Sequence, residues 1–471
     1  MLRLHDTAKG AVVELRPGRP GRLSMYACGP TVYDLPHIGH GRQLLVYDVL
    51  RRYLEWTGVE VDHVSNITDI DDNIIKRGRE EGRPAHEVAE QYEAEHWRAA
   101  AGLGILRPKH VPHATEYVPQ MVELVGELQA RGVAYELPDG VYFSAESVPD
   151  YGLLAQQPLD SLRAGARVEE VAGKRSPVDF ALWKKSKPDE PAWPSPWGPG
   201  RPGWHTECVV MSLDLLGDGF DLHTGGLDLK FPHHENERAQ AVAWGRDFSR
   251  HWMHHAFVEV AGEKMSKSLG NFVTLTDFLA REDGRAYRLL VLQSHYRTPM
   301  EVTPGTVAHA TRSLEGLDLL AERFPTAFPG PEGAGEASGG APAAGLTGPG
   351  RAAELLSRFR AAMEDDLDTP GAVSLAFEAR RAANAAADSG RPEEGAELAG
   401  AVAAMTAALG LFPRPPGREA VPAEIRDLVS RLDEARAGRD FAVSDAIRAE
   451  LTGAGWLVET GPEGTRVRRR S

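Results

Sequence analysis

The stretch that decides the fold is Cys28-Gly-Pro-Thr-Val-Tyr-Asp-Leu-Pro-His-Ile-Gly-His-Gly-Arg42. A mainly apolar run over residues 22–27 precedes it and predicts a strand. Leucine, valine and tyrosine then recur at helical spacing over residues 44–54, which predicts a helix that Gly58 ends. Valine alternates with other residues over residues 59–64, which predicts the next strand. Because a strand–helix–strand unit forces its two strands to run in parallel, we expect an α/β fold.

The turn between this strand and helix is a candidate phosphate site. Ligands bind at this end of a parallel sheet, and the first N–H groups and the dipole of a helix attract phosphate. His37 and His40 are three residues apart, so both can lie on one face of the first helical turn. Gly39 lets a flat ring or a phosphate approach the backbone. On its own, a pair of histidines at this spacing favours simple capping of the helix over a ligand site.

Composition excludes several classes of protein. The chain has 471 residues, which predicts two to four domains. Its net charge of −15 argues against a protein that coats DNA or an anionic membrane, although a local basic surface for one RNA is compatible with it. No run approaches the length of a membrane span, and the first ten residues lack the apolar core of a signal peptide. We therefore expect a cytoplasmic protein in a reducing compartment.

The chain has only two cysteines, Cys28 and Cys208, and they are too few and too far apart for a disulfide framework. Either they are two inert buried thiols, or the fold brings them together as halves of one metal site.

Glycine and proline mark the domain boundaries. Half of residues 325–350 are Gly or Pro, which predicts a flexible linker or a surface insertion. Residues 187–203 are also rich in proline but carry Trp193 and Trp197, which predicts an ordered loop. Beyond the linker, helices are expected over residues 351–363, 371–387 and 393–409, and the sequence PRPPG at 413–417 separates off a small C-terminal unit.

Two downstream segments carry further metal-binding residue types. Gly203-Trp-His-Thr-Glu-Cys208 holds the second cysteine, and Phe231-Pro-His-His-Glu-Asn-Glu237 follows it. A helix that begins after Pro232 places His233 and Glu237 on one face. Two thiolates, an imidazole and a carboxylate fill a tetrahedral zinc shell. The local competitors are His205, His234 and Glu235. Spacing alone leaves a zinc site and a set of separate structural residues equally open.

Two short motifs resemble the signatures of class I aminoacyl-tRNA synthetases. His37-Ile-Gly-His40 matches the first signature, and Lys264-Met-Ser-Lys-Ser268 matches the second. Two lysines three residues apart in a loop of small residues can clamp the β- and γ-phosphates of ATP.

Five longer blocks together resemble the cysteinyl-tRNA synthetase family, and the resemblance runs over residues 1–325 and 351–471. The blocks are CGPTVYD at 28–34, NITDIDDNIIKR at 66–77, RPGWHTEC at 201–208, GGLDL at 225–229 and FPHHENE at 231–237.

The resemblance implies a domain layout. A Rossmann-like parallel-sheet catalytic domain is expected first, with an inserted subdomain, followed by a helical bundle domain and a small C-terminal anticodon-binding domain. The expected ranges are 1–310 for the catalytic domain, about 115–203 for its insertion, 264–268 for its signature loop, 311–324 for a connecting helix, 325–350 for the linker, 351–411 for the bundle and 418–471 for the C-terminal domain.

The resemblance also assigns roles to single residues. The implied zinc ligands are Cys28, Cys208, His233 and Glu237, which hold one ion per chain. The implied cysteine pocket is lined by Cys28, Thr68, Trp204 and His223. The implied ATP-binding residues are Gly29, His37, Gly39, His40, Asp228, Lys264 and Lys267, with Mg²⁺ accompanying ATP. His37, His40, Lys264 and Lys267 are the implied catalytic residues. The acidic cluster of Asp69, Asp71 and Asp72 is ordinary for a helix start and receives no catalytic role.

The implied activity is that of a cysteine–tRNA ligase, acting as a monomer on ATP, L-cysteine and tRNA(Cys), with no membrane and no DNA among its partners. Zinc prefers a thiolate to a hydroxyl, so it would separate cysteine from serine without an editing domain. Residues 421–471 hold nine basic and nine acidic side chains, so this end suits an anion better than the acidic body does.

Three alternatives share parts of this logic. The zinc-dependent ligase that joins cysteine to an amino-sugar in mycothiol synthesis lacks the C-terminal unit. A non-translational paralogue would only bind tRNA or sense cysteine. A small-molecule nucleotidyltransferase would not explain residues 351–471.

Overall fold

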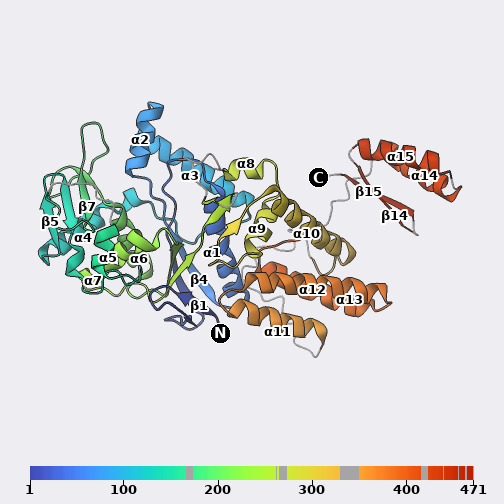
Figure 1. Ribbon diagram of the computed structural model, residues 1–471, viewed down its shortest axis with the longest axis horizontal. Helices are drawn as coiled ribbons and strands as arrows, with labels where there is room; N and C mark the ends of the chain where they lie inside the picture. The colour runs from blue at the N-terminus through green and yellow to red at the C-terminus, as the bar shows by residue number, and fades with distance from the viewer. Residues whose placement is uncertain are drawn as a thin grey trace.

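The structure is a computed structural model (Figure 1). It describes residues 1–165, 173–260, 263–264, 273–328, 350–414, 423–438, 440–454, 456–461 and 464–469.

A parallel sheet forms the centre of the body. Strand β3 (Arg22–Ala27), helix α1 (Ile38–Trp56) and strand β4 (Glu60–Ser65) make the expected strand–helix–strand unit. β3 pairs in parallel with β4 on one side and with β9 (Leu222–Gly226) on the other, and β10 (Trp252–His255) pairs in parallel with β9. The order is therefore β10-β9-β3-β4, and the predicted α/β fold is confirmed.

Burial explains why residues 22–27 form the central strand β3. Leu23 and Met25 are fully buried on β3, and their neighbours Tyr26 and Ala27 are buried as well. A strand buried on both faces belongs in the middle of a parallel sheet. On α1, the apolar side chains that predicted the helix pack against this sheet. The carboxyl ends of the strands therefore all open toward the turn that begins at Cys28.

The inserted region is a second layer with its own core, on the left in Figure 1. Strands β5 (Ala134–Leu137), β6 (Gly140–Phe143), β7 (Phe180–Lys185) and β8 (Gly200–Pro202) form an antiparallel sheet in that order, beside α4 (Val118–Ala130), and α5 (Leu159–Gly165) lies in the β6–β7 connection. In the proline-rich loop, Trp193 pairs with Gly200, and the ring of Trp197 packs 6.1 Å from that of Trp183.

Four further helices lie in the N-terminal half of the chain. α2 (Asp72–Glu81) and α3 (Ala85–Gly102) form a hairpin after β4, while α6 (Trp204–Leu216) follows β8. α7 (Glu235–Trp244) follows β9 through a helical turn over Lys230–His234. α6 therefore carries Cys208, and the start of α7 carries the segment 231–237, to the carboxyl ends of the sheet strands.

The N-terminal hairpin was not anticipated. β1 (Arg3–Asp6) pairs antiparallel with β2 (Ala11–Glu14). The turn between them is bonded to the sheet, because the backbone N–H of Thr7 donates to the carbonyl of Trp252 over 2.9 Å.

The second half of the chain is mostly helical. α8 (Leu275–Leu279) and α9 (Gly284–Leu292) both contact α1. The short strands β11 (Val258–Val260), β12 (Glu263–Lys264) and β13 (Met300–Glu301) form a small sheet. The helix expected over 311–324 begins earlier, as α10 (Pro304–Arg323). Thr303 caps it by accepting from the N–H of Thr306, and Pro304 is at the first helical position, which favours a start there.

The three helices expected beyond the linker are present as α11 (Arg351–Glu364), α12 (Thr369–Asp388) and α13 (Pro392–Ala408). The linker segment 329–349 lies outside the described residues. A small unit of α14 (Ala423–Ala437), α15 (Phe441–Gly453), β14 (Trp456–Gly461) and β15 (Gly464–Arg469) stands apart from the body in Figure 1. The domain boundaries drawn from the sequence stay predictions.

Among the described helices, none combines the length and the apolar character needed to cross a bilayer.

Candidate metal and nucleotide site

Four side chains from distant parts of the chain meet in one buried cluster. Cys28 follows β3, Cys208 lies on α6, and His233 and Glu237 lie around the start of α7. The two Sγ atoms are 3.7 Å apart, and Cys28 Sγ is 3.6 Å from Glu237 Oε1. His233 Nε2 is 3.6 Å from Cys208 Sγ and 3.0 Å from Glu237 Oε1. All four side chains are buried.

These distances fit a tetrahedral ion. Bonds of about 2.3 Å to sulfur and about 2.0–2.1 Å to nitrogen or oxygen separate tetrahedral ligands by about 3.3–3.8 Å. The observed separations run from 3.0 to 3.7 Å. The donor set of two sulfurs, one nitrogen and one oxygen suits zinc, so the residues fit the implied ion.

The electrostatics of the cluster favour a cation. Burial raises the pKa of the Cys28 thiol well above its usual range. Burial also opposes ionisation of Cys208, but the hydrogen bonds from Cys28 and His233 and the charge on His233 together outweigh it and lower the Cys208 pKa to about 6. Burial likewise opposes ionisation of Glu237, but His223 and His233 hold its pKa well below the usual range. Negative charge is thus buried here, and a divalent cation is the natural partner for it.

The histidines of the first signature form a reciprocal cap on α1. His37 Nδ1 accepts from the backbone N–H of His40, and His40 Nδ1 accepts from the backbone N–H of His37 over 3.1 Å. Their rings stack with centroids 3.8 Å apart. Burial lowers the pKa of His37 to about 4, against the opposing charge of nearby Asp228, and lowers that of His40 well below its usual range. Both rings are therefore neutral at pH 7.

The flanks of the second signature reach the first one. Ile38 N–H donates to the carbonyl of Val273 over 3.1 Å, and Leu275 N–H donates to the carbonyl of Pro36 over 2.7 Å. On the other flank, Lys264 pairs its backbone with Glu259 as part of β12. The rest of the signature, including Lys267, lies outside the described residues. Two segments more than two hundred residues apart in sequence are thus neighbours.

Two family descriptions match the chain. The one described as "tRNA synthetases class I (C) catalytic domain" matches residues 14–312, and the one described as "DALR domain" matches residues 358–413.

Curated relatives match over the whole length. A cysteine–tRNA ligase from Alkalilimnicola ehrlichii is 45% identical over 480 residues, which span 100% of both chains. A cysteine–tRNA ligase from Halorhodospira halophila is 42% identical, again over 100% of both. The chain belongs to the cysteine–tRNA ligase family of class I aminoacyl-tRNA synthetases.

Solved structures share the fold of this family member at low sequence identity. A methionyl-tRNA synthetase from Mycobacterium tuberculosis, solved with methionyl-adenylate, is 17% identical with a TM-score of 0.60, and the match covers 90% of this chain and 96% of that one. A putative arginyl tRNA synthetase from Campylobacter jejuni is 13% identical with a TM-score of 0.54, covering 83% and 92%.

In this cysteine–tRNA ligase family member, two of the residues expected in the cysteine pocket contact the four-residue cluster directly, and Thr68 is bonded to Glu207, the sequence neighbour of Cys208. The Trp204 ring stacks on His233 with centroids 4.0 Å apart and is 38% exposed. His223 Nε2 is 2.8 Å from Glu237 Oε2, and its Nδ1 atom has no hydrogen-bond partner in the described part of the chain. The Thr68 hydroxyl donates to Glu207 Oε2 over 2.8 Å.

The competitors named for the metal have other positions. His205 Nδ1 is 2.8 Å from Nδ1 of His233, so it contacts the ring nitrogen of His233 that does not face Cys208 and Glu237. Glu235 accepts from the backbone N–H of Leu154 over 2.7 Å. His234 Nε2 is 3.3 Å from Cys28 Sγ, and His234 joins a second, overlapping group of possible ligands with Cys28, His223 and Glu237.

Gly29 has a packing role that the sequence did not reveal. A Cβ atom there would lie 1.5 Å from the carbonyl oxygen of Asn66, so only glycine lets the two loops approach. Asn66 also accepts from the N–H of Gly29 over 2.9 Å, and its Oδ1 atom is 3.9 Å from Cys208 Sγ. Asn66 was overlooked, although it is two residues before Thr68 in a block that carries the resemblance.

The acidic side chains after β4 have partners within the protein. Asp71 caps α2 by accepting from the N–H of Asn73, and Asp72 pairs with Lys184 over 2.6 Å and with Arg201. Asp69 accepts from the hydroxyl and the N–H of Thr115, and burial raises its pKa.

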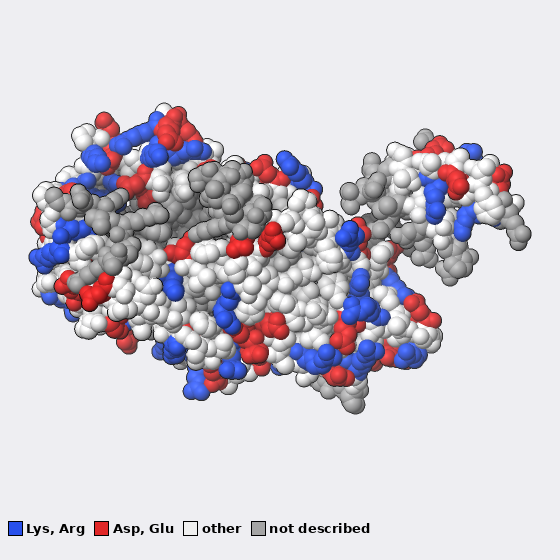
Figure 2. All heavy atoms as spheres, in the orientation of Figure 1, with Lys and Arg blue, Asp and Glu red and all other residues white. Residues whose placement is uncertain are grey.

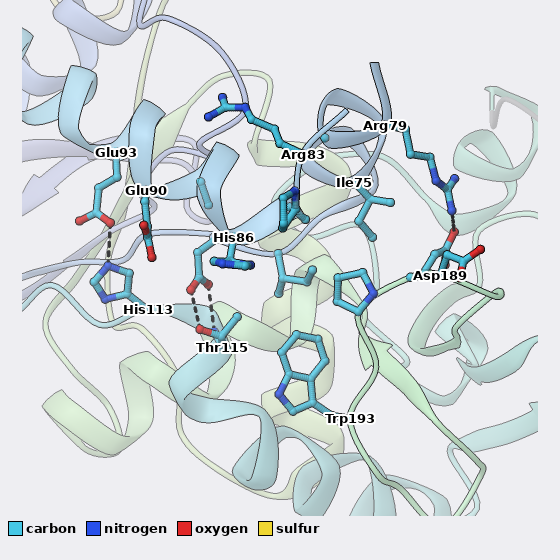
Figure 3. A pocket seen from close by; sticks show the side chains of 18 of the residues that line it. Ile75, Arg79, Arg83, His86, Glu90, Glu93, His113, Thr115, Asp189 and Trp193 are labelled. Carbon is cyan, nitrogen blue, oxygen red and sulfur yellow. Dashed lines mark hydrogen bonds and ion pairs between the residues drawn. The ribbon is translucent and has the colours of Figure 1, made fainter. Parts of the chain in front are cut away.

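A large pocket of about 1140 Å³ lies next to this cluster, between α2, α3 and the proline-rich loop (Figure 3). Its charged groups pair with one another: His113 with Glu93 over 2.9 Å, and Arg79 with Glu190 over 3.1 Å. Carboxylates outnumber arginines on its wall, which does not suit RNA phosphates. The predicted site residues do not line it. We assign it no part in the reaction. On the face in Figure 2, basic and acidic side chains lie close to one another around the edges of the body, and much of the middle is uncharged.

Proposed function

We propose that this enzyme activates L-cysteine with ATP to cysteinyl-adenylate and transfers cysteine to the 3′-terminal adenosine of tRNA(Cys), with zinc recognising the substrate sulfur. The buried group of Cys28, Cys208, His233 and Glu237 carries the proposal, because these four side chains fit one thiophilic ion beside the nucleotide turn. Full-length relatives named as cysteine–tRNA ligases support the same reaction.

Selection of cysteine rests on the chemistry of the four-residue cluster. A zinc ion held there would supply a preference for thiolate over hydroxyl, which an apolar pocket cannot supply between cysteine and serine. Trp204 limits the pocket from outside by stacking on His233. His223 offers its unpartnered Nδ1 atom toward a ligand group, while its Nε2 atom holds Glu237.

Adenylation needs orientation and charge stabilisation rather than a protein base. The substrate carboxylate is already a nucleophile, so the work is to align it with the α-phosphate and to stabilise the phosphate charge. The start of α1 directs its dipole there, while the N–H groups of Ile38 and His40 are bonded to Val273 and His37. Neutral His37 and His40 bring hydrogen bonding without net charge. Lys264 and Lys267 are proposed to hold the outer phosphates, with Mg²⁺ accompanying ATP.

The experiment measures cysteine-dependent ATP–pyrophosphate exchange, charging of tRNA(Cys) and zinc content on one sample. We expect all three from the wild-type protein, and loss of zinc and exchange together in Cys208→Ala. Ser212→Ala is the matched control, because Ser212 is buried one turn further along α6 and its hydroxyl donates to the carbonyl of Val209.

Three results would contradict the proposal. Full zinc occupancy in Cys208→Ala would refute the ligand set. Exchange without charging would favour a ligase that joins cysteine to an amino-sugar, and charging without zinc would remove the metal from the mechanism.

A further inference from the structure

A buried chain of hydrogen bonds leads away from the Cys28 sulfur to the N-terminal hairpin. His234 Nε2 lies 3.3 Å from Cys28 Sγ. The other ring nitrogen of His234, Nδ1, lies 2.9 Å from Nε2 of His254. His254 Nδ1 in turn lies 2.7 Å from the hydroxyl of Thr7. All four side chains are buried, so water does not compete for these bonds.

Neighbouring residues leave space for these hydrogen-bonded side chains and hold them in place. A Cβ atom on Gly225 would lie 2.4 Å from Cε1 and 2.8 Å from Nε2 of His234, so the glycine of β9 leaves the space that the imidazole fills. Thr7 is held at the other end, because its N–H donates to the carbonyl of Trp252 on β10. The ring of Trp252 lies 5.5 Å from that of His234 and closes the remaining side.

Two roles compete for His234. It belongs to an overlapping group of possible ligands with Cys28, His223 and Glu237, so its position alone would allow it to bind the ion. Alternatively, its Nε2–H donates to the sulfur. A metal-bound thiolate carries no proton and can only accept. The donor and the acceptor of every hydrogen bond in this series are then fixed. Thr7 donates to His254, His254 donates to His234, and His234 donates to Cys28.

The charge of the centre decides between these roles. Two thiolates and one carboxylate exceed the charge of a divalent ion by one, and the surplus is buried. An N–H aimed at a ligand sulfur offsets that surplus, whereas a second, neutral nitrogen ligand does not. The other ligands have partners of the same kind, since His205 contacts His233 and His223 contacts Glu237.

We infer that His234, His254 and Thr7 form a positioning relay for Cys28, in which His234 is a hydrogen-bond donor to the ligand sulfur and not a metal ligand. The inference rests on the proposed metal centre and adds to it the three residues that hold its first sulfur.

The test removes the relay at its far end. Thr7→Val replaces the hydroxyl by a methyl group of similar size, and Thr7→Ser keeps the hydroxyl. The zinc dissociation constant is measured by chelator competition, and the sulfur-to-cobalt charge-transfer band is recorded after Co²⁺ substitution. We expect Thr7→Val to weaken zinc binding by about fivefold, the equivalent of one net hydrogen bond. The band should move to longer wavelength, because the sulfur lone pairs lose the N–H. Thr7→Ser should behave as wild type.

A second variant and a control separate the relay from general stability. His254→Phe keeps a ring and removes both nitrogens, so it should weaken zinc binding by about tenfold and shift the band in the same direction. Thr406→Val makes the same exchange at a buried threonine of α13 whose hydroxyl donates to the carbonyl of Ala403, and it should leave the band unchanged.

The outcomes are distinguishable. An unshifted band and unchanged affinity in Thr7→Val and His254→Phe overturn the relay while the metal centre stands. Equal losses in Thr7→Val and Thr406→Val also overturn it. A wild-type protein that binds no zinc overturns the proposed function and the relay together.

Discussion

The Nδ1 atoms of His205 and His233 lie 2.8 Å apart, so one of them carries the shared proton. His233 directs its Nε2 atom at Cys208 Sγ and Glu237 Oε1. When that nitrogen binds an ion, the proton is on Nδ1 of His233, and His205 is the acceptor. This bond fixes both the tautomer and the ring orientation of a proposed ligand.

Replacing His205 should therefore weaken metal binding. We expect His205→Phe to raise the zinc dissociation constant by about 10- to 100-fold, the usual effect of losing the partner of a ligating histidine. His205→Asn can present an amide oxygen near the position of Nδ1 and should lose much less. Chelator competition measures both. Equal losses in the two variants would show that ring packing, not the hydrogen bond, is what His205 contributes.

Arg42 should be essential for stability although it follows the first signature closely. Its buried guanidinium donates to the carbonyls of residues 257, 295, 296 and 298. Arg42→Met keeps the stem but removes four hydrogen bonds from a charged donor, which we expect to cost about 3–5 kcal/mol in the free energy of unfolding. Urea denaturation checks this. Arg312→Met, on an exposed part of α10, is the control, and a loss as small as in that control would contradict the prediction.

Acid should destabilise the fold through His63. Burial lowers its pKa to about 3, and the positive charge of Arg51 adds to the effect. Neither ring nitrogen has a hydrogen-bond partner in the described part of the chain. The unfolded chain takes up this proton below about pH 6.5, while the folded chain does so only near pH 3. Between these values each pH unit of acidification removes about 1.4 kcal/mol of stability, and below the folded pKa this loss levels off.

The measurement compares urea unfolding at pH 7 and pH 5 for wild type and His63→Leu. The variant should lose less stability on acidification than wild type. His309→Leu changes an exposed histidine and should keep the wild-type dependence on pH. Identical pH dependence in all three proteins would remove His63 as the cause.

The Gly/Pro-rich segment should be dispensable for cysteine activation. Residues 329–349 lie outside the described part of the chain, and their composition does not favour a packed core. Deleting residues 333–344 should leave cysteine-dependent pyrophosphate exchange within about twofold of wild type. A Gly/Ser replacement of the same length separates loss of length from loss of sequence. A large loss of exchange in both would mean that the segment contributes to the catalytic half.

Much of the sheet could be predicted because local patterns specify it. β3, α1 and β4 were readable because the apolar period changes from strand to helix and back. The hairpin of β1 and β2 was missed, because four-residue strands of mixed polarity give little periodic signal. The place of β9 beside β3, and of β10 beside β9, was also hidden, since the pairing partner of a strand depends on tertiary contacts rather than on its own sequence.

The sequence could predict which residues form the site, but not the hydrogen bonds that connect them. The sequence pointed to Cys28, Cys208, His233 and Glu237, and the structure brings them together. It could not separate the roles of His205 and His234, because these depend on which ring nitrogen faces which neighbour. Nor did it indicate Asn66, whose amide holds Gly29 through a contact between two loops.

The pairing of Cys28 with Cys208 has a practical consequence. The chain has no third cysteine, so with the proposed ion bound both sulfhydryls are masked. Any thiol that reacts with a maleimide or disulfide reagent on the native protein then comes from the demetallated fraction. Alkylation becomes a titration of vacant centres. The same scarcity lets a single cysteine introduced on the surface carry a fluorophore or spin label without removing any native residue.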